Sequence, residues 1–126
     1  MTEALPMPDL VAALKAAAEP TRLRILLLLS RGELSVKDLT QVLGQSQPRL
    51  SRHLKLLAEA GLIERFRDGS WVYFHISDRT AGGHLARRLI AAVEGHDAVA
   101  RRDRERLEAL KRDREQVAQA YFRTHA

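Results

Sequence analysis

The stretch 46–63 holds the side chains of this chain that are best suited to sequence-specific hydrogen bonding. An arginine fork pairs with O6 and N7 of guanine, a glutamine amide pairs with N6 and N7 of adenine, and a lysine ammonium meets a phosphate. Residues of these types line one side of a predicted helix, so the expected chemistry is contact with the major groove of DNA. The candidate contacts in this helix are Ser46, Gln47, Arg49, Ser51, Arg52, His53 and Lys55.

The opposite side of the same predicted helix is apolar. Leu50, Leu54 and Leu57 recur at intervals of four and three residues, which places them on one stripe. Arg52 lies roughly opposite this stripe and is therefore expected to be exposed. His53 lies near the edge of the stripe, so packing or a bond to the backbone is an alternative to DNA contact.

Three further helices are predicted before this one. Apolar residues recur at helical spacing over 8–18 and 21–31, and the second of these helices is apolar around most of its circumference, which favours a buried position. The residues 35–38 fit a capping box that begins a third helix, and Gly44 ends it. Because the turn before the N-cap Ser46 is so short, the third and fourth helices are expected to form a helix-turn-helix.

Two short strands are predicted after the fourth helix. The residues 62–66 alternate in polarity, 71–76 are rich in aromatic and β-branched side chains, and the Asp-Gly pair between them favours a tight turn. A hairpin directly after a helix-turn-helix predicts a winged helix. Trp71, Tyr73 and Phe74 are expected to pack in the sheet and core. The charged residues of this wing are either solvated or contact phosphates or the minor groove. The candidate wing contacts are Arg65, Arg67 and Gly69.

The remaining residues predict two more helices. The first covers 84–94 and is apolar on one face. The second covers 97–122, is highly charged, and carries a broken apolar stripe that could pack on a partner subunit or on the first helix. The chain, residues 1–126, is thus expected to form one mainly α-helical, dimeric domain with a small β-hairpin. Its predicted parts are a winged helix-turn-helix core at 8–77 with its wing at 62–76, and C-terminal dimerisation or packing helices at 84–122.

Composition narrows the classes of function. The 126 residues include 21 lysines and arginines against 16 acidic residues, a formal charge of +5, which favours a polyanionic partner, nucleic acid first. The absence of cysteine excludes disulfides, thiolate-held metals and cysteine redox switches. No apolar run is long enough to span a membrane and the first residues lack a signal sequence, so a cytoplasmic location is expected. Ser51 and His53 point in different directions on one helix and cannot form a nucleophile–base pair, so no enzyme activity is expected.

These motifs, in this order, resemble the ArsR/SmtB family of bacterial winged-helix repressors. The matching stretches are 19–26, 33–39, 46–57, 60–63 and 67–74. The resemblance implies a homodimer that binds a palindromic operator in double-stranded DNA and leaves it when an inducer binds. It also implies that the first and fifth helices form the dimer interface. The interface candidates are Leu10, Leu14, Leu85, Leu89 and Val93.

Two departures from the family pattern bear on the inducer. Thiolate metal sensors of the family carry cysteines in the third helix where this chain has Ser35 and Lys37, and a hydroxyl and an ammonium are poor partners for a soft metal. The second metal site of the family lies on the fifth helix, where only His84 and His96 come near its pattern. These histidines are weak candidates, and solvated surface histidines are the simpler interpretation. We therefore expect no metal site.

The last predicted helix has a resemblance of its own. Residues 100–122 look like the connector in relatives that join this winged helix to a methyltransferase domain. That similarity adds S-adenosylmethionine or S-adenosylhomocysteine as an effector candidate, although the chain has no nucleotide-binding motif and no cofactor is otherwise expected. Two alternatives to a repressor therefore stay open. One is a DNA-binding appendage of such a methyltransferase, and the other is a winged helix that binds a protein partner.

Overall fold

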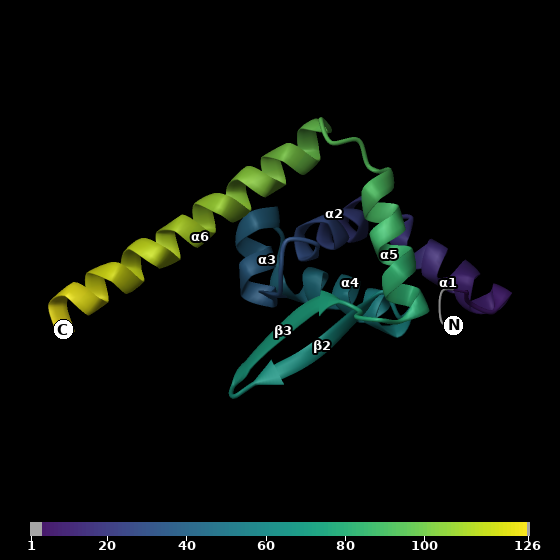
Figure 1. The fold of residues 1–126 in the computed structure, drawn as a ribbon, viewed down its shortest axis with the longest axis horizontal. Coiled ribbons are helices and arrows are strands. Elements are labelled where there is room, and N and C mark those ends of the chain that lie inside the picture. The colour runs from purple at the N-terminus through teal and green to yellow at the C-terminus, as the bar shows by residue number, and fades with distance from the viewer. Residues whose placement is uncertain (1–3, 126) are drawn as a thin grey trace.

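The computed structural model describes residues 4–125, and its elements follow the predicted order (Figure 1). The expectation of a mainly α-helical winged helix-turn-helix with a small β-hairpin is confirmed. Among the described residues, no helix combines the length and the apolar character needed to cross a membrane. The helices are α1 (Met7–Ala17), α2 (Pro20–Leu29), α3 (Val36–Leu43), α4 (Gln47–Glu59), α5 (Ala81–Ala92) and α6 (Ala98–His125). The strands are β1 (Leu34–Ser35), β2 (Ile63–Asp68) and β3 (Trp71–Ile76).

The helix-turn-helix is built from local signals that the sequence carries. The predicted capping box is present: the Ser35 side chain accepts from the backbone N–H of Asp38 at 3.1 Å, and the Asp38 carboxylate accepts from the Ser35 N–H at 2.9 Å. Gly44 takes the left-handed conformation, with φ of 67°, directly after α3. Ser46 then caps α4. These caps fix where each helix of the pair begins and ends.

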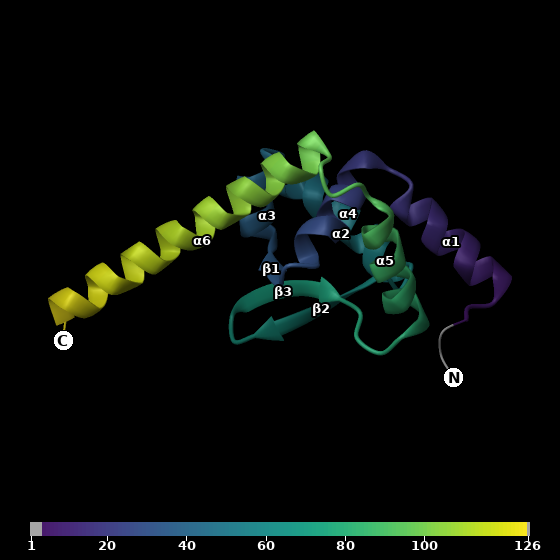
Figure 2. The same ribbon diagram turned by 45° about the horizontal axis from the view of Figure 1, so that its top comes forward.

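The hairpin joins a third strand to form a small antiparallel sheet with the order β1-β3-β2 (Figure 2). Asp68 pairs with Trp71, so the turn of the wing consists of Gly69 and Ser70, and Gly69 has the positive φ of 62° that glycine adopts without strain. Strand β1 pairs Leu34 with Phe74 and was not predicted. A strand of two residues is too short to show any alternation, so the sequence carries no signal for it.

Helix α5 begins at Ala81, three residues before the predicted start, because Gly82 and Gly83 lie inside its first turn. Thr80 caps this turn by accepting from the N–H of Gly83 at 3.0 Å. A Cβ atom on Gly82 would meet the backbone carbonyl of Gly61, and one on Gly83 would meet the backbone carbonyl of Ser77. The two glycines therefore allow α5 to pack directly on the backbone around the wing.

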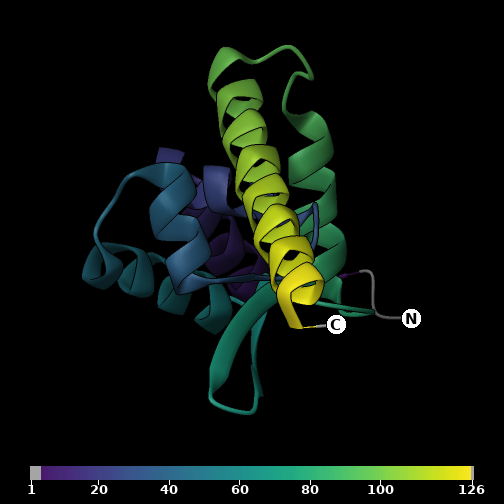
Figure 3. The same ribbon diagram turned by 90° about the vertical axis from the view of Figure 1, so that its left-hand side faces the viewer.

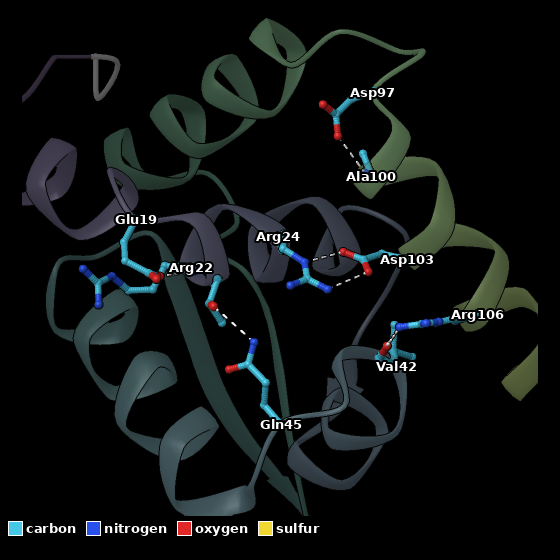
Figure 4. Close-up of polar contacts among 10 residues, drawn as sticks. Glu19, Arg22, Arg24, Val42, Gln45, Asp97, Ala100, Asp103 and Arg106 are labelled. Carbon is cyan, nitrogen blue, oxygen red and sulfur yellow. Dashed lines mark hydrogen bonds and ion pairs between the residues drawn. The ribbon is translucent and has the colours of Figure 1, made fainter.

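Helix α6 runs back across the body after α5 and continues beyond it, which Figure 1 and Figure 3 show from two sides. It packs on α2 and α3 of its own chain. Of the two predicted packing partners, the first helix is therefore wrong, and packing on a partner subunit stays a prediction. Leu107 is fully buried in the shared core, and Arg24 of α2 forms an ion pair with Asp103 of α6 (Figure 4). These two contacts anchor the first half of the long helix to α2 and the core.

Candidate nucleic-acid interface

Helix α4 presents a polar side to solvent because its apolar side is fully used by the core. Leu50, Leu54 and Leu57 are buried, as their spacing predicts. The helix is therefore fixed in rotation, and the side opposite the leucines remains free. The exposed candidates for DNA contact at the N-cap and on α4 are Ser46, Gln47, Arg49, Ser51, Arg52 and Lys55.

The start of α4 is held by Gln45, the residue of the short turn directly before the N-cap Ser46. The Gln45 amide donates to the Thr21 hydroxyl of α2 at 3.2 Å (Figure 4). The Gln45 amide oxygen accepts from Nε of Arg49 at 3.0 Å. One side chain thus ties the turn of the helix-turn-helix to α2 and orients an exposed arginine. The only sequence signal for this role is an amide next to a helix cap.

His53 is corrected from a DNA-contact candidate to a structural residue. Its ring is buried, and Nη1 of Arg22 donates to Nδ1 of His53 at 3.2 Å. The Glu19 carboxylate lies 3.9 Å from the same nitrogen. Burial lowers the pKa of His53, and although Glu19 raises it, the positive charge of Arg22 and neighbouring arginines lowers it further. The ring is therefore neutral near pH 7 and accepts a hydrogen bond from Arg22.

Arg22 and Glu19 connect three helices through this site. Nε of Arg22 donates to the carbonyl oxygen of Ala16 at the end of α1 at 2.5 Å, and its backbone N–H donates to the Glu19 carboxylate at 2.8 Å. Burial raises the pKa of the Glu19 carboxyl. Hydrogen bonds from the backbone of Arg22 and Thr21, together with the nearby His53, lower this pKa by more than burial raises it, so it lies below the ordinary value. The ionised Glu19 caps α2 while His53 fixes α4 to the same corner.

The wing carries its basic residues on one exposed side of β2. Arg65 and Arg67 are two residues apart and therefore point to the same side of the sheet, and both are exposed. Phe66 points to the other side and stacks on Tyr73, with ring centroids 5.6 Å apart. Gly69 lies in the exposed turn at the tip. The wing thus offers cations beside α4 while its aromatic residues hold the hairpin together.

Trp71 differs from its expected position. Phe74 is buried and Tyr73 is half-buried, as predicted, but the Trp71 side chain is 60% exposed. Trp71 stands at the first position of β3, next to the turn, where the hairpin has already left the helices. A strand pattern gives the side of the sheet but not the point at which the core ends, so the sequence overestimated the burial of this residue.

The candidates for a dimer interface lie on α1 and α5, except Val93, which directly follows α5 as its C-cap. Leu14 is exposed, whereas Leu10 is half-buried. The three candidates that were predicted in the fifth helix are also half-buried. Met7 and Val11 add two exposed apolar side chains on α1. A hollow of about 570 Å³ lies between the start of α1 and α5. The half-buried candidates of the fifth helix are Leu85, Leu89 and Val93.

The two weak metal candidates do not share a site with a third ligand. His84 is exposed on α5, and His96 is exposed in the loop before α6. Across residues 4–125, no group of three histidine, aspartate or glutamate side chains is placed to hold a metal ion.

A helix-turn-helix whose second helix exposes a polar face, followed by a hairpin with two exposed arginines, defines the chain as a winged helix-turn-helix protein. The sequence pattern of the bacterial regulatory proteins of the arsR family matches residues 19–65. An arsenical resistance operon repressor of Bacillus subtilis is 40% identical over 76 residues, which cover 60% of this chain and 72% of that protein. The chain belongs to the ArsR family.

Two further similarities agree with this assignment. An arsenical resistance operon repressor of Escherichia coli is 53% identical over 64 residues, which cover 50% of this chain. The chain spans 55% of the length of that relative. Among solved structures, a homodimeric winged helix-turn-helix DNA-binding domain of Mycobacterium bovis, described as a possible ArsR-family regulator, matches with a TM-score of 0.59 and 32% identity, covering 68% of this chain and 74% of that one.

Proposed function

We propose that this chain is a sequence-specific DNA-binding transcriptional regulator, acting as a homodimeric repressor. The observation that carries the proposal is the exposed polar side of α4, whose rotation is fixed by three buried leucines and whose start is fixed by Gln45. A helix held in this way presents Arg49 and Arg52, which are three residues apart, on one exposed face, as recognition of base edges requires. The wing arginines Arg65 and Arg67 would hold the flanking backbone or minor groove.

A second copy of the chain would complete the DNA-binding unit. The apolar side chains on α1 and the hollow between α1 and α5 support a two-fold interface at this end of the molecule. Two recognition helices related by a two-fold axis read half-sites about 34–36 Å apart, one turn of DNA, so the operator would be palindromic. The family membership and the homodimeric relative of known structure support the same arrangement.

The inducer in this proposal is not a metal held by α3. The Ser35 hydroxyl is already engaged as the cap of α3, and Lys37 is a cation. These residues do not fit a soft metal, which binds thiolates. The inducer is therefore a ligand other than a soft metal, and it would act by favouring a dimer geometry whose recognition helices no longer match the groove spacing.

Fluorescence anisotropy with a duplex from upstream of the gene tests the proposal. The protein should bind this duplex more tightly than a scrambled duplex of equal length. Arg52→Ala should weaken specific binding about 10- to 100-fold, the range for loss of a good base contact. The matched control is Arg112→Ala, because Arg112 is exposed on α6 away from α4. Equal binding to both duplexes, or unchanged binding by Arg52→Ala, would overturn the assignment of α4.

A further inference from the structure

A hollow of about 490 Å³ lies between α3, the first part of β3, and α6. It contains none of the residues proposed to contact DNA and none of the dimer candidates. Its volume falls within the range of about 300–1,000 Å³ that is typical of small-molecule sites. Because α6 forms one wall, the hollow exists only where this long helix packs on the winged helix.

Aromatic side chains form one wall of the hollow. Trp71 and Tyr73 are two residues apart on β3, so both side chains point to the same side of the sheet. Trp71, the one tryptophan of the chain, is 60% exposed, which is a large exposed fraction for an aromatic side chain of this size. Leu110 of α6 adds an apolar surface. A flat apolar group is the ligand part that fits such a wall, because offset or edge contacts with aromatic rings favour planar partners.

Hydrogen-bond donors and positive charge come from the two facing helices. Lys37 and Gln41 are one turn apart on α3 and therefore lie on the same side of that helix. Arg114 reaches in from α6 and forms an ion pair with Asp38, whose side chain is only 3% exposed. The two cations and one carboxylate leave a net charge of one positive unit in the lining, which favours a singly charged anion.

Asp38 holds two elements in place at this site. One of its oxygens caps α3 by accepting from the Ser35 N–H, and the other pairs with Arg114. A guanidinium has five N–H donors, so Arg114 keeps donors free for a second carboxylate while it pairs with Asp38. An anionic ligand can therefore bind Arg114 and Lys37 together without breaking the cap of α3.

We propose that this hollow binds a planar aromatic carboxylate. The ring would lie against Trp71 and Tyr73, and the carboxylate would bind Lys37 and the free edge of the Arg114 guanidinium. Such a ligand would contact the first helix of the helix-turn-helix, the wing and α6 at once. Its role as an effector of DNA binding rests on the proposed function, whereas its binding does not.

Trp71 provides the readout, because it is the one tryptophan in the chain. Wild-type protein without DNA is titrated with benzoate while the tryptophan fluorescence is followed, and calorimetry repeats the titration. Two matched probes separate the parts of the ligand: cyclohexanecarboxylate has the charge without the aromatic ring, and benzamide has the ring without the charge. We expect a saturable signal with benzoate and binding at least about tenfold weaker with either control, a difference of about 1.4 kcal/mol.

Variants locate the site. Lys37→Gln and Arg114→Gln should each weaken benzoate binding about tenfold, whereas Arg112→Gln, which removes an exposed charge from the same helix outside the lining, should leave it unchanged. Melting temperatures show whether Arg114→Gln still folds. If it does not, Lys37→Gln alone decides the result, because Lys37 is an exposed side chain on α3.

Three results would overturn the proposal. The first is the absence of saturable benzoate binding, and the second is equal binding of the three probes. The third is a loss of benzoate binding in the Arg112→Gln control as large as that in Lys37→Gln. A tryptophan response to duplex DNA but not to benzoate would assign this surface to DNA instead. If benzoate binds but does not change DNA affinity in the anisotropy assay, the site stands and its effector role is wrong. This result is distinct from failure of the proposed function, in which the duplex itself is not recognised.

Discussion

Arg24 of α2 and Asp103 of α6 form a two-bond ion pair between residues 79 positions apart in the sequence. Nε of Arg24 donates to Oδ2 of Asp103 at 2.8 Å, and Nη2 donates to Oδ1 at 2.9 Å. The hydrogen bonds to Asp103 raise the pKa of Arg24. The paired geometry fixes both the position and the rotation of α6. The hollow between α3, β3 and α6 therefore depends on this pair, although neither residue lines it.

Removing one partner of this pair should destabilise the fold. Asp103→Ala leaves Arg24, whose side chain is 20% exposed, without a partner. We expect a loss of about 2 kcal/mol in the free energy of unfolding, less than for a fully buried pair because Arg24 keeps some contact with water. Urea unfolding measures the loss. Glu105→Ala is the control, since its pair with Arg101 spans 4.0 Å and is mostly exposed, and it should cost less than about 0.5 kcal/mol. Equal losses would show that the Arg24–Asp103 pair does not hold α6.

The buried His53 predicts that stability falls in mildly acidic solution. Burial and nearby arginines lower the pKa of His53 in the folded protein below its ordinary value. As the pH falls, His53 in the unfolded chain gains its proton first, near its ordinary pKa of about 6.5. The unfolded state is then favoured, so stability decreases below about pH 7 until the folded-state pKa is passed.

Urea unfolding at several pH values between about 7.5 and 5.5 tests this dependence. His53→Gln keeps a polar side chain without a titration and should show a smaller loss of stability over this range. His84→Gln is the control, because His84 is exposed on α5, and it should follow the wild type. The explanation fails if the two variants and the wild type show the same slope.

Local sequence signals account for the parts of this molecule that were predicted. The leucine stripe of α4, the capping box at Ser35 and the hairpin each involve residues within a few positions of one another, so spacing alone reveals them, although the turn consists of Gly69 and Ser70 and not of the Asp-Gly pair. The missed features depend on tertiary contacts. Gln45 meets Thr21 only after the helices pack, and His53 is buried only because the α1–α2 corner covers it. A residue at the edge of an apolar stripe cannot be assigned to core or surface without that neighbour.

Two glycines at the start of α5 should be intolerant of any side chain. Gly83→Ala places a Cβ against the backbone carbonyl of Ser77, which cannot move away as a flexible side chain would. The first turn of α5 must then shift, and we expect a loss of more than about 2 kcal/mol, although alanine is the better helix former by about 1 kcal/mol. Thermal unfolding gives the result. Gly95→Ala is the control, since a Cβ there meets nothing within 4 Å. An equally small change in both variants would show that α5 does not pack this closely.

The wing arginines should determine how strongly DNA binding depends on salt. A protein that neutralises phosphates releases counterions, so the logarithm of its affinity falls with the logarithm of salt concentration by about 0.9 for each phosphate contact. The combined change of Arg65 and Arg67 to alanine should lower this slope by about 0.9 for every contact removed, while the preference for the operator over a scrambled duplex is largely kept. Anisotropy titrations at several salt concentrations measure both quantities. Arg112→Ala should leave the slope unchanged, because that residue is exposed on α6. An unchanged slope in the wing variant would mean that the hairpin does not touch the DNA backbone and that Arg65 and Arg67 are solvated charges.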